Sequence, residues 1–248
     1  TGVLATSELY KQALMNAGGC IATDSFQRVR AQRVEANIKF LVNQANLRKS
    51  ELKNGSVKEF VKMLKKINAD REGLNLKNVE VAAYASPEGG FKFNDKLAGK
   101  RQSVSEAYVD KQLKAAKLGG ANVDAHYTAQ DWDGFKRLVQ ASNIQDKDVI
   151  LRVLEMYKDP AEREQQIRNM SAGFRELADG ILPELRRSRL IINYETVGRS
   201  DEQIKEQYKA DAAQLSADEL LYAATLTNDA NEKEAIYKKA AECYDKDY

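Results

Sequence analysis

Apolar and polar residues alternate in three short stretches of the chain, which is the pattern of a β-strand with one buried face. The stretches cover residues 34–42, 79–85 and 123–127. The second runs into Pro87–Glu88–Gly89–Gly90, a sequence typical of a turn. We therefore predict three strands, with a loop directly after the second strand.

Two segments between these strands carry apolar residues at helical spacing. The first covers 57–67 and follows Ser56 and Glu59, whose spacing predicts a capping box. The second starts after Asn94, an expected N-cap, and continues to Gly119–Gly120. The order strand, helix, strand, helix, strand implies a parallel crossover. It predicts an α/β (α+β) sandwich, with a small mixed sheet of about four strands covered by helices.

A long helical segment, at about 129–186, follows the third strand. Its apolar residues indicate four helices, of which the third begins at Asp159–Pro160, an N-cap and N1 pair. Ser171 is the expected cap of the fourth helix. From Ser200 the pattern changes, because SDEQ and SADE are two capping boxes, each followed by a short amphipathic helix.

The loop from Ser86 to Asn94 is the first candidate site. It joins the end of a strand to the start of a helix, where free main-chain N–H groups converge and bind anions. Arg101 follows two turns inside that helix, on its apolar face. Because a buried arginine is costly unless it is paired, it is expected to bind either a ligand carboxylate or a structural carboxylate. The structural carboxylates within reach are those of Glu80, Asp95 and Glu106.

The same region resembles the OmpA C-terminal-like domain, the periplasmic module that holds outer-membrane proteins to peptidoglycan. The residues in register with the family motif, without a gap, are Tyr84, Gly89, Asn94, Leu97, Arg101 and Tyr108. The departures are Ala83, Ala85, Ala98, Gln102 and Ser105, with Val104 one place before the family's valine. A further departure bears on function, because Ser86 occupies the place of the family's aspartate.

The resemblance implies a module that binds the diaminopimelate of the peptidoglycan stem peptide. In the family, the aspartate and the helix arginine both bind the diaminopimelate, so Arg101 is expected to bind the diaminopimelate carboxylate. Ser86 is able to accept a hydrogen bond there but brings no charge. Glu88, two residues further on, is a candidate to supply the negative charge that the family's aspartate would provide. The geometry of the loop decides whether the Glu88 carboxylate reaches that position. Gly89 and Asn94 are expected to shape the loop.

The resemblance extends to the last strand, in the segment LRRSRLIINYE, where the family has an arginine pair. Ser188 and Arg189 occupy the positions of this pair. Arg187 and Arg189 are expected either to add positive potential to the peptidoglycan pocket or to be solvated. The insertion at 129–186, with DWDGF near its start, resembles OmpA-like proteins of the Bacteroidetes type.

We therefore expect three regions. Residues 1–25 are a lead-in, interpreted as the tail of a missing upstream domain, and residues 26–199 form the OmpA-like domain. Residues 200–248 resemble the start of a tetratricopeptide-repeat region, whose helices would recruit a protein partner. The beginning at Thr1 and the ending inside a helical pattern favour a fragment. The resemblance implies a location at the periplasmic face of the outer membrane.

Composition adds little to this interpretation and excludes several classes. The chain of 248 residues has 39 Lys and Arg against 37 Asp and Glu, a balance that does not support binding to nucleic acid or to a membrane surface. No apolar run is long enough to span a bilayer. Cys20 and Cys243 lie at opposite ends of the chain, and we expect two unpaired, mostly buried thiols.

No set of residues indicates catalysis, a cofactor or a metal site. His126 shares a strand face with Asp124 but has no serine or cysteine signature beside it. Asp131 and Asp133 flank Trp132 at a spacing that suits a metal or a glycosidase pair. Acids at a helix start are more simply explained by the helix dipole, so we expect no enzyme.

The alternative function belongs to another class: an OmpA-like fold without glycan binding, acting as a protein-interaction scaffold in a surface or secretion assembly. An open, positively lined pocket at the Ser86–Asn94 loop would favour peptidoglycan binding. A loop filled by the inserted helices, with Arg101 already paired, would favour the scaffold.

Overall fold

The computed structural model describes residues 26–169 and 175–244. The predicted lead-in at 1–25, Cys20 within it, and Ser171, the expected helix cap, lie outside the described residues. The chain divides into two compact units. The larger is Ala31–Glu195, and the smaller comprises the described residues 26–30 and 196–244.

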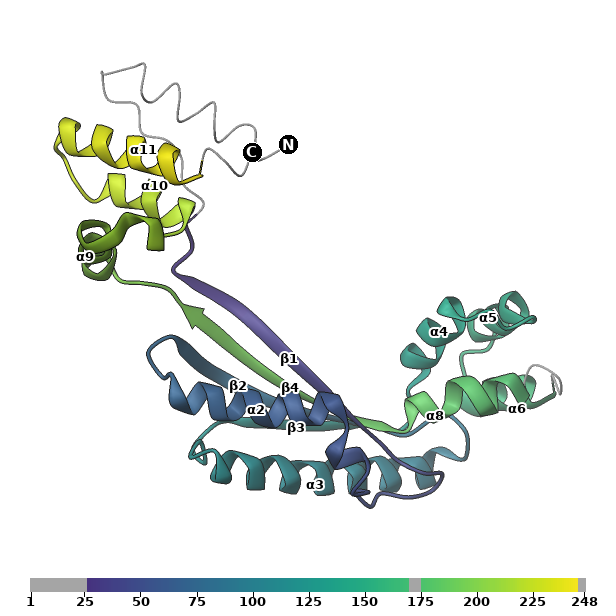
Figure 1. The fold of residues 1–248 in the computed structure, drawn as a ribbon. Helices are drawn as coiled ribbons and strands as arrows, with labels where there is room; N and C mark the ends of the chain where they lie inside the picture. The colour runs from purple at the N-terminus through teal and green to yellow at the C-terminus, as the bar shows by residue number, and fades with distance from the viewer. Residues whose placement is uncertain (1–25, 170–174, 245–248) are drawn as a thin grey trace. The chain divides into compact units, whose positions relative to one another are not determined.

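One four-stranded mixed sheet, with the strand order β1-β4-β2-β3, forms the centre of the fold (Figure 1). The strands are β1 (Val29–Lys39), β2 (Leu74–Tyr84), β3 (Val123–Thr128) and β4 (Arg187–Val197). β2 and β3 are parallel, with Val79 opposite Val123. β4 is antiparallel to β1, since the N–H of Phe40 donates to the carbonyl of Arg186 where β1 ends and β4 begins. The predicted α/β class with a mixed four-stranded sheet is confirmed at this level.

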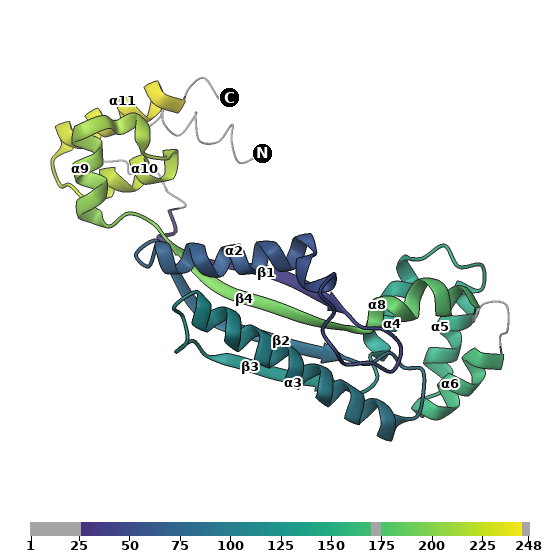
Figure 2. The ribbon, with the colours of Figure 1, turned by 60° about the horizontal axis from the view of Figure 1, so that its bottom comes forward.

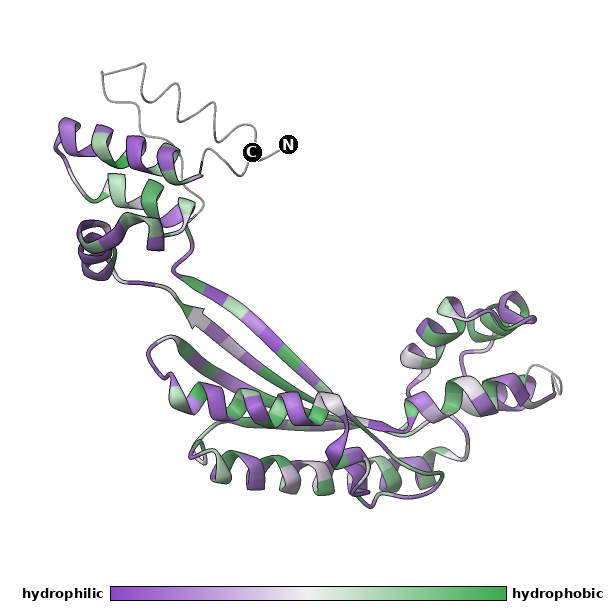
Figure 3. Ribbon diagram, in the orientation of Figure 1, coloured by the Kyte–Doolittle hydropathy of each residue, from purple (hydrophilic) through white to green (hydrophobic). Residues whose placement is uncertain are grey.

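Helices α2 (Gly55–Ala69) and α3 (Phe91–Ala115) cover one face of this sheet (Figure 2). Phe60 of α2 and Leu113 of α3 are buried in one core with Ile38 and Ile192 of the strands. Figure 3 shows the corresponding alternation of apolar and polar residues along the strands. Successive strand residues point to opposite faces, so the second face carries polar side chains near the insertion, together with the buried Ile191. Those of β1 and β4 near the insertion are Glu35, Asn37, Lys39, Arg187 and Arg189.

The structure corrects two predicted helix starts. After the short 3₁₀ turn η1 (Glu51–Lys53), α2 is capped by the side chain of Asn54, not by the Ser56–Glu59 box. Helix α3 already begins at Phe91, so Asn94 lies inside its first turn and is not the N-cap. The Asn94 side chain is therefore available to bind the preceding loop.

The inserted segment forms a helical layer with its own core. Its elements are α4 (Trp132–Ala141), α5 (Lys147–Met156), α6 (Pro160–Asn169), the π-helical turn η2 (Leu177–Ile181) and α8 (Leu182–Leu185). Phe135, Ile150 and Leu177 are buried at its centre. The predicted cap at Asp159 is confirmed, because its side chain accepts from the N–H groups of the first turn of α6.

The smaller unit is helical apart from the strand ends. It contains α9 (Asp201–Asp211), the 3₁₀ turn η3 (Ala212–Gln214), α10 (Ala217–Thr225) and α11 (Ala230–Tyr244). Both predicted capping boxes are confirmed, at Ser200 with Gln203 and at Ser216 with Glu219. Cys243 is a free, half-buried thiol. Of the helices in the described ranges, none combines the length and the hydropathy that crossing a bilayer requires.

Candidate functional site

The side chain of Arg101 is buried inside the larger unit, with 1% of its surface exposed. Its Nε donates to the carbonyl of Gln44 at 2.9 Å, Nη1 to that of Tyr84 at 2.9 Å, and Nη2 to that of Leu41 at 3.2 Å. The guanidinium also lies 4.9 Å from the ring centre of Phe40. Arg101 thus joins α3 to the end of β2 and to the loop after β1.

A structural ion pair, one of the two alternatives for Arg101, is not formed with any described residue. All three of its hydrogen bonds go to main-chain carbonyls. Of the expected partners, Asp95 accepts a hydrogen bond from the hydroxyl of Tyr127, and the Glu80 carboxylate lies 3.7 Å from His126. Three carbonyl dipoles therefore take the place of a carboxylate.

Burial is the main electrostatic influence on Arg101. It lowers the pKa of the guanidinium from 12.5 to about 10, and the positive charge of Arg186 acts in the same direction. The carboxylate of Glu88 opposes both effects. Since this pKa still lies well above neutral pH, Arg101 carries its charge inside the fold, where directed carbonyl groups must compensate for the lost water.

The loop after β2 is held in shape from within by Asn94. The Asn94 side chain is 2% exposed, and its Nδ2 donates to the carbonyls of Ser86 at 3.0 Å, Glu88 at 3.0 Å and Gly89 at 3.3 Å. Gly89 has a φ of 91°, a conformation that glycine adopts without strain. The two residues expected to shape the loop therefore lie in direct contact.

The negative charge of Glu88 is balanced by Arg186, at the end of the insertion. Its Oε1 accepts from the hydroxyl of Ser86 at 2.9 Å and from Nε and Nη2 of Arg186 at 2.8 and 2.6 Å. Glu88 thus lies directly beside Ser86. Its charge is matched by an arginine that is itself only 9% exposed.

The insertion also provides a hydrogen-bond acceptor for the main-chain amide of Gly89 in the loop. The N–H of Gly89 donates to Oε1 of Glu164 in α6 at 2.9 Å, and the carbonyl of Gly89 accepts from Nε2 of Gln130 at 3.2 Å. The space left between the loop and the inserted helices is about 20 Å³, which is room for about one water molecule. The loop is therefore closed by the chain's own insertion.

Arg189 lies away from this loop, on the sheet face opposite the helices. Its Nε and Nη2 donate to the two carboxylate oxygens of Glu35, both at 2.7 Å. This bidentate pair raises the pKa of Arg189 and lowers that of Glu35. Arg187 lies over the ring of Tyr84 at 4.7 Å and 3.2 Å from the carboxylate of Asp131. The structure therefore does not bring Arg187 or Arg189 to Arg101, and it gives each a carboxylate partner.

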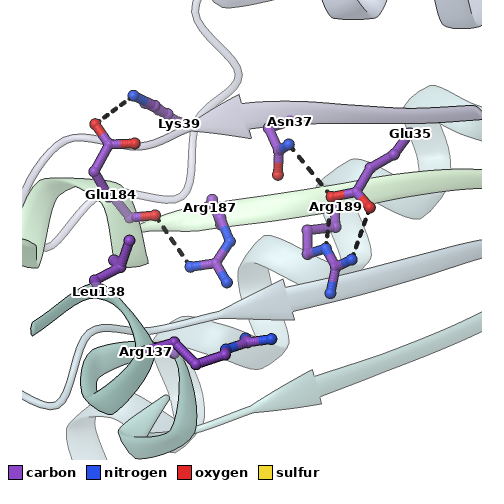
Figure 4. Close-up of a pocket in the computed structure, with 9 residues that line it drawn as sticks. Glu35, Asn37, Lys39, Arg137, Leu138, Glu184, Arg187 and Arg189 are labelled. Carbon is purple, nitrogen blue, oxygen red and sulfur yellow. Dashed lines mark hydrogen bonds and ion pairs between the residues drawn. The ribbon is translucent and has the colours of Figure 1, made fainter. Parts of the chain in front are cut away.

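Two clefts lie beside α4 on this same sheet face. One of about 340 Å³ borders β1 and β4 and is lined by Arg189, Arg187 and Arg137 (Figure 4). The other, of about 550 Å³, borders the carboxyl ends of β2 and β3 and is lined by Arg137 and Lys136, among others. Arg137 and Lys136, like Glu164 and Arg186, were not identified from the sequence. They lie in the inserted segment. Their roles arise from the packing of this segment against the sheet and the loop, and such packing produces no local pattern in the sequence.

Neither a scan against protein-family models nor a search of the curated proteins found a match to this chain. Among the described residues, no group of three or more His, Cys, Asp or Glu side chains is placed to hold a metal ion. The class that the structure defines is therefore an α/β module with one mixed four-stranded sheet, a helical insertion and a second, helical unit.

Proposed function

We propose that the chain is a non-catalytic, OmpA-like module of the cell envelope, at the periplasmic face of the outer membrane, that acts as a protein-interaction scaffold in a surface or secretion assembly. The order strand, helix, strand, helix, strand around the Gly89–Asn94–Arg101 motif supports an OmpA-like assignment. The observation that carries the scaffold role is the closure of the Ser86–Asn94 loop by the insertion.

A ligand carboxylate would have to replace existing contacts at this loop. Arg101 is 1% exposed and already donates to three carbonyls. The Gly89 amide already has the carboxylate of Glu164, and Glu88 already has Arg186. Leaving a buried charged partner unpaired costs several kcal/mol, roughly 3–5 kcal/mol for a buried ion pair. These contacts favour an interlocked structural element over a ligand pocket.

The smaller unit provides the proposed partner surface. Its helices bury a core of their own around Ile204, Leu220 and Ile236. A cleft of about 240 Å³ lies between α9 and the start of α11 and is lined by Tyr208 and Leu226, among others. Helical pairs with such clefts suit the docking of a peptide or helix from another protein.

The second candidate is the binding of peptidoglycan through the diaminopimelate of its stem peptide. The observation that favours it is the arrangement of Asn94, Ser86 and Glu88, which puts a carboxylate beside the position of the family's aspartate. In this version, the stem peptide displaces Glu164 from the Gly89 amide and binds at the loop.

Co-sedimentation of the purified chain with peptidoglycan sacculi separates the two candidates. The scaffold proposal expects the chain to remain in the supernatant. Co-sedimentation that is lost in Glu88→Gln and in Arg101→Ala, but retained in Arg152→Ala, would overturn it in favour of the stem peptide. Arg152 is a suitable control because it is exposed on α5 and has no partner among the described residues. Glu88→Gln is included because Arg101→Ala is expected to destabilise the unit.

The scaffold role has a positive test as well. After mild solubilisation of the envelope, we expect the chain to sediment in a complex heavier than its own mass of 27.8 kDa. Sedimentation as a free chain, without partner proteins, would contradict a scaffold function.

A further inference from the structure

The two clefts beside α4 meet at shared residues. The larger lies where the parallel strands β2 and β3 end, with Tyr84 and Thr128 in its lining. The smaller lies along β1 and β4 (Figure 4). Arg137 and Arg189 line both clefts. These two arginines therefore mark the junction of one extended binding surface between α4 and the sheet.

The cations at this junction differ in whether a carboxylate binds them. Arg189 forms the bidentate pair with Glu35, and Lys39 lies 2.5 Å from Glu184. Arg137 extends from α4 and makes no hydrogen bond or ion pair with any described residue (Figure 4). An arginine without a partner, among arginines that have one, is free to bind an anion.

The charge balance of the larger cleft is positive. Lys136 lines it next to Arg137 and likewise has no ion pair within the described part of the chain. Two carboxylates, Asp131 and Asp133, share the lining. Asp131 is 4% exposed, caps α4 and lies 3.2 Å from Arg187, so its charge is matched. Two unpaired cations therefore remain against the exposed Asp133.

Three buried polar atoms of residues that line the larger cleft have no hydrogen-bond partner among the described residues. One is Oδ2 of Asp131, which lies 3.2 Å from the guanidinium of Arg187. The other two are Oε1 of Gln130, an acceptor, and Nε1 of Trp132, a donor. The other end of the Gln130 amide donates to the carbonyl of Gly89 at 3.2 Å, and the Trp132 ring lies edge-on to Phe135 with the ring centres 5.6 Å apart. Buried polar atoms are normally satisfied by protein, water or ligand. These atoms have almost no exposed surface, so the two side chains must shift slightly toward the cleft before a ligand group with both a donor and an acceptor, such as an amide or a hydroxyl, satisfies both.

We propose that these clefts bind a small carboxylate ligand with an amide or hydroxyl group beside the carboxylate. The planar guanidinium of Arg137 binds the carboxylate, and Lys136 adds a second positive charge. Gln130 and Trp132 bind the amide or hydroxyl. A volume of about 550 Å³ lies within the range of about 300–1,000 Å³ that is usual for small-molecule sites.

This chemistry occurs at the end of a peptide and in an acidic N-acetylated sugar. The site does not use the side chain of Arg101, but it adjoins the Ser86–Asn94 loop. Tyr84, which lines the larger cleft, accepts from Arg101 through its carbonyl, and Gln130 donates to Gly89 of the loop. Glu88→Gln changes only the loop and Arg137→Ala only the clefts, so these two variants distinguish binding at the two places.

Isothermal titration calorimetry of the full chain tests the proposal with N-acetylalanine, N-acetylmuramic acid and inorganic phosphate. We expect at least one of the two carboxylates to bind, and phosphate to bind at least about tenfold more weakly. Binding of N-acetylalanine alone identifies a peptide end, and binding of N-acetylmuramic acid alone identifies a sugar. Arg137→Ala is expected to weaken binding by about tenfold or more, because it removes a charged hydrogen-bond donor. Arg152→Ala is the matched control and is expected to bind as the native chain does.

Three results would overturn the proposal. They are the absence of binding by both carboxylates, an affinity that Arg137→Ala leaves unchanged, and an equal affinity for phosphate. Trp132→Phe keeps an aromatic ring but removes the N–H. It should weaken the binding of the amide-bearing ligand and leave acetate binding unchanged, whereas an equal loss for acetate would overturn the role given to Trp132.

Discussion

Replacing Arg101 by methionine separates a structural role of this arginine from a ligand-binding role. Methionine fills much of the same apolar volume but donates no hydrogen bond. The change therefore removes the three bonds to the carbonyls of Leu41, Gln44 and Tyr84. If these bonds hold three segments of the larger unit together, the variant must be less stable. An arginine kept for a ligand would contribute little to stability.

The magnitude follows from two opposing contributions. A hydrogen bond from a charged donor contributes about 1.5–3 kcal/mol, so three contribute roughly 5–9 kcal/mol. Against this, burial and Arg186 lower the pKa of Arg101 from 12.5 to about 10, which corresponds to a cost of roughly 3 kcal/mol for keeping the charge. We therefore expect Arg101→Met to lower the free energy of unfolding of the larger unit by about 2–6 kcal/mol.

Urea unfolding followed by tryptophan fluorescence measures this change, because Trp132 is the only tryptophan and lies in the larger unit. Arg152→Met is the matched control, since Arg152 is exposed and has no partner among the described residues. A change for Arg101→Met within about 0.5 kcal/mol, which is usual for a surface substitution, would refute the structural role. It would return Arg101 to consideration as a ligand-binding residue.

Two further predictions concern the loop and the second sheet face. Asn94→Ala removes the amide that donates to three loop carbonyls. Hydrogen–deuterium exchange at residues 86–90 should therefore be faster in this variant than in the native chain. Unchanged exchange would show that the amide does not hold the loop. The hydrogen bonds from Arg189 lower the pKa of Glu35 in the folded chain below its ordinary value of 4.5. The pair therefore stabilises the fold fully at pH values above 4.5, and this stabilisation is lost as the pH falls through the lowered pKa of Glu35. In urea-unfolding experiments, the difference in free energy of unfolding between the native chain and Glu35→Gln should therefore be largest near neutral pH and should shrink on acidification. A difference that does not depend on pH would contradict this linkage.

Local patterns were sufficient to predict much of the fold. The alternation around Ile38 and Val81 predicted β1 and β2, because one face of each strand must be buried for the sheet to form. The capping boxes at Ser200 and Ser216 were predicted for a similar reason, since donor and acceptor lie within one turn. The start of α3 was not, because Asn94 has the chemistry of an N-cap but binds the loop from inside the helix.

The candidate site depended on contacts between distant segments, which local patterns do not encode. The hydrogen bond from Gly89 to Glu164 spans 75 residues, and the pair of Arg186 with Glu88 spans 98. Arg101 was correctly expected to lie on an apolar face. Its partners were not predicted, because main-chain carbonyls carry no signature in the sequence.

The strand order β1-β4-β2-β3 has a consequence for how the chain folds. The strand between β1 and β2 is β4, the last of the four to be synthesised, and the whole insertion precedes it. Until β4 arrives, β1 and β2 each keep an unpaired edge, and the bidentate pair of Arg189 with Glu35, 154 residues apart, cannot form. Long-range pairings of this kind make folding slow, and unpaired edges make the partly folded chain prone to aggregation. A chain that emerges gradually, from the ribosome or across a membrane, therefore completes its sheet only after the whole insertion has emerged.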